Sequence, residues 1–144
     1  MRRAVLVIAV CLLAACSAAK PKTTMSIKDQ MKQVVEPASN TLFTIQGEVD
    51  PANAPTPSPA DEARWRAADT AASTLKGVAA TLMEPQRAKD QADWKMYAAD
   101  MGKFADEAAQ AARKKDGAAL SQAVNALSDN CAACHKVYKL QAAA

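Results

Sequence analysis

Apolar residues recur at alternating three- and four-residue steps along four segments of the chain, and this spacing restricts the fold to packed α-helices. About a quarter of the 144 residues are alanine, which has the highest helix propensity, and only 4 are glycine. The β-branched runs with period two that indicate strands are missing after the first segment. A chain of this length forms one domain. We therefore expect a single all-α domain.

The predicted helices have similar lengths and are joined mostly by short connections. They run from Ser26 to about Gly47, from Ser58 to Glu84, from Asp90 or Asp93 to Lys115, and from the Asp116-Gly117 turn through Tyr138. Pro37 lies inside the first helix and predicts a kink, because it removes one backbone hydrogen bond. A proline-rich connection at residues 48–59 follows. Four rods of about 30 Å predict an antiparallel four-helix bundle in a domain over residues 26–144.

Residues 1–15 have the features of a signal peptide. Arg2 and Arg3 precede an apolar run, residues 4–13, that is too short to span a bilayer. The run ends in Leu13-Ala14-Ala15-Cys16, which resembles the bacterial lipobox, whose cysteine carries the lipid. The alternative is ordinary cleavage with Cys16 incidental. Both interpretations predict that the chain is exported. The first predicts a periplasmic protein anchored to a bacterial membrane, inner or outer, with residues 16–25 as a tether.

The formal charge of +3 is small, and two of the cations belong to the signal peptide. The lysines and arginines of the remaining chain form no long block. This pattern does not predict nucleic-acid binding.

The segment Cys131-Ala132-Ala133-Cys134-His135 holds the only histidine of the chain. A disulfide between these cysteines would be strained within a helix, a thioredoxin-like pair requires a βαβ setting, and a structural zinc site requires four ligands. C-x-x-C-H in an exported chain is the attachment signature of haem c, with thioethers at both cysteines and the histidine on iron. We therefore expect one covalent haem c. With the histidine on iron, no acid–base or nucleophile constellation remains, so we do not expect an enzyme.

Residues 26–141 resemble the class II cytochromes c, the cytochrome c′ family. The resemblance rests on four amphipathic helices and on a haem motif near the carboxyl end that Tyr138 and Lys139 follow, as in C-x-x-C-H-x-x-Y-[RK]. It implies a four-helix bundle in which Cys131 and Cys134 bind haem and His135 is the fifth iron ligand.

The resemblance implies two functions that differ at the sixth iron position. In the low-spin branch a methionine of the first helix ligates iron and the protein carries electrons to redox partners. Met31 has that place here, Met25 is a weaker candidate, and simple packing of Met31 is the alternative. In the high-spin branch the position is open and binds nitric oxide or carbon monoxide. A homodimer is a further arrangement that the resemblance implies, and a haem-free structural lipoprotein is the remaining alternative.

Overall fold

The computed structural model describes residues 25–52, 61–88 and 92–141, and these residues form four helical rods without a strand. The first rod is continuous and consists of α1 (Ile27–Gln30), a π-helical turn η1 (Met31–Val35) and α2 (Glu36–Val49). The others are α3 (Glu62–Leu82), α4 (Ala92–Lys114) and α5 (Gly117–Gln141). None of the helices in these ranges combines the length and hydropathy that crossing a membrane requires.

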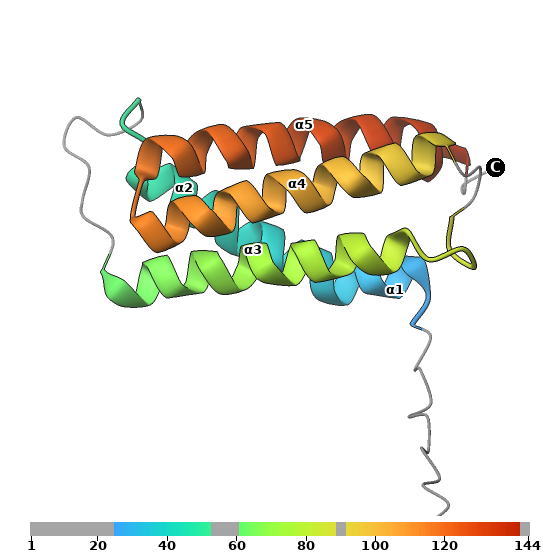
Figure 1. Ribbon diagram of the computed structural model, residues 1–144, viewed down its shortest axis with the longest axis horizontal. Helices are drawn as coiled ribbons and strands as arrows, with labels where there is room; N and C mark the ends of the chain where they lie inside the picture. Colours follow the sequence, from blue (N-terminus) through green and yellow to red (C-terminus); the bar gives the residue numbers. More distant parts are fainter. Residues whose placement is uncertain (1–24, 53–60, 89–91, 142–144) are drawn as a thin grey trace, which may run out of the picture.

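Consecutive rods run in opposite directions and form a four-helix bundle (Figure 1). α3 packs on α4, α4 packs on α5, and α2 closes the ring by packing on both α3 and α5. The start of α1, the end of α3, the start of α4 and the end of α5 meet at one end, on the right of Figure 1. The predicted fold class is confirmed.

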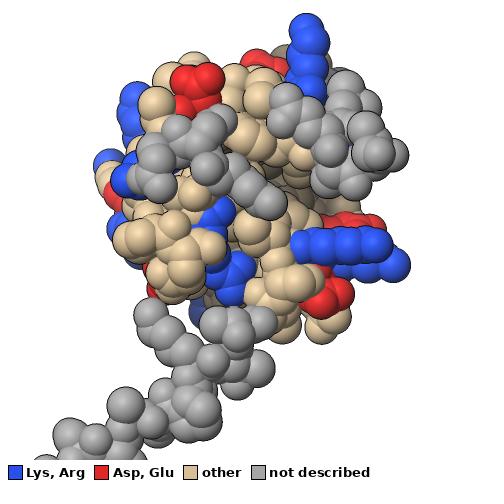
Figure 2. Space-filling view, turned by 90° about the vertical axis from the view of Figure 1, so that its right-hand side faces the viewer, with Lys and Arg blue, Asp and Glu red and all other residues tan. Residues whose placement is uncertain are grey.

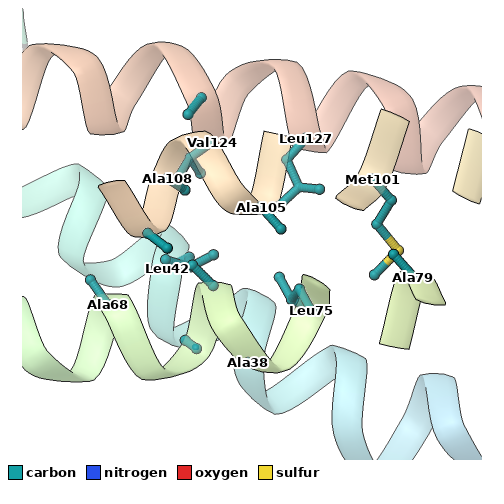
Figure 3. Packing of buried hydrophobic residues seen from close by; sticks show 14 of the residues in the cluster. Ala38, Leu42, Ala68, Leu75, Ala79, Met101, Ala105, Ala108, Val124 and Leu127 are labelled. Atoms are coloured by element: carbon teal, nitrogen blue, oxygen red, sulfur yellow. The ribbon is translucent and has the colours of Figure 1, made fainter. Parts of the chain in front are cut away.

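Small side chains dominate the core of this bundle. The largest completely buried side chains are Leu42, Ile45, Leu75, Leu120, Val124 and Leu127, and alanines fill most of the space between them (Figure 3). α3 and α4 approach closely, since a Cβ added to Gly102 would lie 3.4 Å from Cβ of Ala79. The buried stripes that the sequence predicts on α3 and α4 are confirmed, except that Tyr97 is only partly buried.

The chain accommodates Pro37 by a widened turn. The N–H of Glu36 donates to the carbonyl of Met31, five residues back, so that η1 is π-helical and Pro37 occupies the second position of α2. A regular turn would press the proline ring against the carbonyl four residues earlier. A π turn adds one residue, which rotates the preceding segment by about 100° around the axis relative to a regular helix. Gln30 is therefore buried five residues before buried Val35, whereas the later steps are of three and four.

The predicted helix start at Ser26 is confirmed, because its Oγ accepts a hydrogen bond from the N–H of Asp29 at 3.1 Å. The predicted helix end near Gly47 is too early. α2 continues to Val49, so the connection predicted at 48–59 begins at Asp50.

The predicted start of the second helix is wrong, because α3 begins at Glu62. Its N-cap is Asp61, whose side chain accepts from the N–H of Arg64 at 2.8 Å. Ser58 and Pro59 lie outside the described residues.

The turn from α4 to α5 is tight and needs a glycine for space. Lys115 has a positive φ of 55°, and the N–H of Asp116 closes the end of α4 by donating to the carbonyl of Ala111 at 3.0 Å. α5 then begins at Gly117 against the end of α2. A Cβ at Gly117 would lie 2.5 Å from the carbonyl oxygen of Val49, so any side chain there must displace backbone.

We expect Gly117→Ala to lower the free energy of unfolding by about 1–3 kcal/mol, because the added methyl group overpacks a contact between two backbones. Gly77→Ala is the matched control: a Cβ there meets nothing within 4 Å, and alanine favours the interior of α3, so it should raise stability by about 1 kcal/mol. Urea denaturation followed by circular dichroism measures both changes. Equal gains in both variants would contradict the contact between Gly117 and Val49.

Candidate functional site

The C-x-x-C-H motif lies within α5, which continues through it as one helix. Cys131 and Cys134 are partly buried and His135 is exposed, and no disulfide joins the cysteines. Residues three and four apart share one face of a helix. Within the described ranges, no group of three or more histidine, cysteine, aspartate or glutamate side chains gathers to hold a metal ion. The two thiols and the imidazole thus lie along a face and do not surround one point.

A pocket at this end of the bundle brings together predicted site residues that lie far apart in the chain. Met31 from η1 lines the same pocket as Cys131, Cys134 and His135 from α5. The remaining wall is largely apolar and comes from three rods: Val35, Leu82, Trp94, Tyr97, Ala98 and Met101, with Asn130 beside the motif. Figure 2 shows this end of the molecule, where acidic and basic side chains both occur among uncharged ones.

Three other methionines, Met25, Met83 and Met96, do not line this pocket. Met25 is partly buried, and its carbonyl accepts a hydrogen bond from Arg87. Met96 and Met83 are exposed, at 49% and 39%. Met101 lines the wall and is buried, as predicted for a core residue. Cys16, the predicted lipid site, lies outside the described residues.

Aromatic side chains fix the wall of the pocket on α4. Trp94 is buried and its indole N–H donates to the carbonyl of Leu82 at 2.6 Å, which satisfies a carbonyl at the end of α3. The ring of Tyr138 packs edge-on against Trp94, with centroids 4.9 Å apart, and against Tyr97 at 6.4 Å. Tyr138, one turn beyond the motif, therefore ties the end of α5 to the start of α4.

Asn130 is a site residue that the sequence analysis missed. Its side-chain amide donates to the backbone carbonyl of Tyr97 at 3.0 Å, so it links α5 to α4 directly before Cys131. No sequence pattern marks it, because its partner is a backbone atom 33 residues away.

The electrostatic setting of the motif differs from that of a redox-active cysteine pair. Burial raises the pKa of the Cys131 thiol, whereas a catalytic thiol has a lowered pKa that supplies thiolate near neutral pH. The pKa of His135 is lowered by partial burial and by the charge of Lys139. A lowered pKa keeps the imidazole neutral, which is the form that binds a metal.

The donor set fits a haem c. Two thiols three residues apart can each form a thioether, the neighbouring imidazole can bind iron, and the thioether of Met31 lines the same pocket from the first rod. The cavity itself is about 50 Å³, below the range of roughly 300–1,000 Å³ for pockets that hold cofactors. Binding a macrocycle therefore requires wall side chains to move outward. The flexible side chains of Met31 and Met101 suit such a movement.

We expect Trp94→Phe to lower the free energy of unfolding by about 1–3 kcal/mol, because it leaves the carbonyl of Leu82 without its buried donor. Trp65→Phe, at the opposite end of the bundle and similarly buried, controls for the smaller aromatic area. Thermal denaturation measures both variants. A loss no greater for Trp94→Phe than for Trp65→Phe would show that this hydrogen bond contributes little.

Comparison with protein families gives one match, in which the model described as "Cytochrome C'" covers residues 22–139. Comparison with curated proteins and with solved structures gave no match.

Proposed function

The chain belongs to the cytochrome c′ family, and on this premise we propose that it carries single electrons, with the iron of its haem c held by His135 and Met31. The family binds haem c covalently through a C-x-x-C-H motif, which this chain has at residues 131–135. Cys131 and Cys134 are the thioether positions in this proposal. The bound group would supply a one-electron couple.

The observation that supports electron transfer is the position of Met31. It lines the pocket from the first rod while His135 lines it from α5, so the two side chains approach one pocket from different rods. A thioether opposite an imidazole is an established axial pair that raises the reduction potential of haem. With both axial positions filled from the protein, gases have no open site.

The composition of the pocket wall also favours a carrier. Val35, Leu82 and Trp94 are all buried and give the pocket wall an apolar surface. No carboxylate lines the pocket within the described residues; its titratable side chains are Tyr97, His135 and the two cysteines of the motif. A largely apolar wall without a carboxylate suits a reaction that moves an electron without chemistry on a substrate.

The location and partners of the carrier follow from the amino-terminal sequence and the family. Members of the family are typically periplasmic, and we propose export of this chain with a lipid on Cys16 that holds the bundle near a bacterial membrane. Its partners would be redox proteins that reach the pocket end of the bundle. A homodimer, as the family resemblance implies, is compatible with this arrangement, and nucleic acid is not among the proposed partners.

Met31→Ala tests the proposed function. The wild-type holoprotein should show low-spin spectra that carbon monoxide barely disturbs, with the weak far-red band of thioether-bound ferric haem. The variant should lose that band and bind carbon monoxide at least about tenfold more tightly, which corresponds to about 1.4 kcal/mol. Visible absorption of oxidised and reduced protein, with and without carbon monoxide, measures these changes.

Met96→Ala is the control, because Met96 is exposed and does not line the pocket. A wild-type protein that binds carbon monoxide at once, with spectra that Met31→Ala leaves unchanged, would reject methionine ligation. That result would favour the alternative function, a module with an open sixth site that binds nitric oxide or carbon monoxide.

A further inference from the structure

A buried polar residue directly precedes Met31 in the first rod. Gln30 is only 9% exposed, although it lies in the first turns of the rod, where polar side chains usually face solvent. Its amide nitrogen donates to Oγ1 of Thr81 in α3 at 2.8 Å, and its amide oxygen accepts from Nη1 of Arg87 at 2.9 Å. Both polar atoms of the side chain are therefore paired.

Arg87 holds the same rod at a second point. Its Nη2 donates to the backbone carbonyl of Met25, just before the N-cap of α1, at 2.7 Å. One guanidinium thus bridges a backbone atom ahead of the helix and a side chain within it. Thr81 is fixed in turn, because its hydroxyl donates to the carbonyl of Val78 at 2.8 Å. We call Gln30, Thr81 and Arg87 the polar bridge.

The π turn brings Gln30 to the polar bridge. In a regular helix that continues the stripe of Ala38 and Leu42, Gln30 would lie well to one side of the buried face. The extra residue of η1 rotates it inward toward α3. Met31, the next residue, then lies about 100° further around the axis and lines the pocket.

Apart from the polar bridge, the Ser26 cap and a few partly buried apolar side chains that pack against the core hold the start of this rod. Ile27 is only partly buried, and Lys28 and Asp29 are exposed. Helix ends with few buried contacts open locally at low free-energy cost. A side chain in such a segment would sample many positions unless a specific interaction fixed its backbone.

We propose that the polar bridge positions Met31, by fixing the first turns of the rod so that the thioether stays at the pocket. Gln30 and Arg87 are positioning residues: neither lines the pocket with the motif and Met31, and in this proposal they act through the backbone of η1. The consequence for iron ligation rests on the proposed function, whereas the fixing of the segment does not.

The test compares the wild-type holoprotein with Gln30→Ala and Arg87→Lys. The first variant removes the amide, and the second keeps the charge but lacks the planar fork that makes both contacts. Gln46→Ala is the matched control, because Gln46 lies in the same rod and its amide also donates across the bundle, to Asn125 at 2.8 Å, but far from the pocket. Two quantities are measured: hydrogen exchange of the amides of residues 27–35, and the far-red band together with carbon monoxide affinity.

We expect both bridge variants to speed exchange in residues 27–35 about tenfold, to weaken the far-red band and to raise carbon monoxide affinity, while Gln46→Ala changes neither quantity. Unchanged exchange would overturn the proposal, and so would faster exchange that leaves methionine ligation intact in a wild type that shows it. If the wild type lacks the far-red band, the proposed function fails. Hydrogen exchange then tests only whether the polar bridge fixes residues 27–35. Faster exchange in the bridge variants would support this, and unchanged exchange would overturn it.

Discussion

The close packing of alanines between α3 and α4 is the contact on which the rest of the bundle depends. Ala68 and Ala72 on α3 and Ala105 and Ala108 on α4 have no exposed surface, and Figure 3 shows Ala68, Ala105 and Ala108 in the core together with Leu42 and Leu75. Dispersion and loss of water contact act over many small contacts here. Because the rods are held close along most of their length, the large side chains at one end, Trp94 above all, define where the pocket lies.

α5 carries the motif out of this dry core to the pocket. Leu127 is 1% exposed, Cys131 one turn later is partly buried, and His135 is exposed. Burial thus decreases along α5. The first half of the helix packs in the core, and the second half places the thiols and the imidazole at a surface that a cofactor can reach. The contacts of Asn130 and Tyr138 with α4 keep that second half in place.

The fold and the motif could be predicted from sequence because both depend on local spacing. Helical periodicity indicated the buried stripes of α3 and α4, and the C-x-x-C-H spacing indicated the face that Cys131 and His135 share. The same periodicity placed Met31 on the inner side of the first rod; the π turn changes its orientation relative to a regular helix, and Met31 lines the pocket. Whether it ligates iron stays a prediction.

The features that the sequence did not indicate depend on contacts between distant segments or on a choice between similar local signals. Glutamine is usually a surface residue. The burial of Gln30 is explained only by its hydrogen bonds with Thr81 and Arg87, 51 and 57 residues away. Pro37 predicted a kink in the helix, but a π turn and a kink are both local responses to a residue without a backbone N–H. Ser58 and Asp61 both have good capping side chains, and the structure uses Asp61.

The π turn also affects how this chain is aligned with others. Met31 stands seven positions before Ala38, but the extra residue in η1 gives it the orientation that a regular helix assigns to the position six before. An ungapped alignment with a relative that lacks the turn would therefore match the relative's residue with the orientation of Met31 to Lys32, an exposed cation. A single gap between residues 31 and 36 restores the correspondence. Homology models and ligand assignments for chains with a proline at this place in the first helix should consequently be built with that gap.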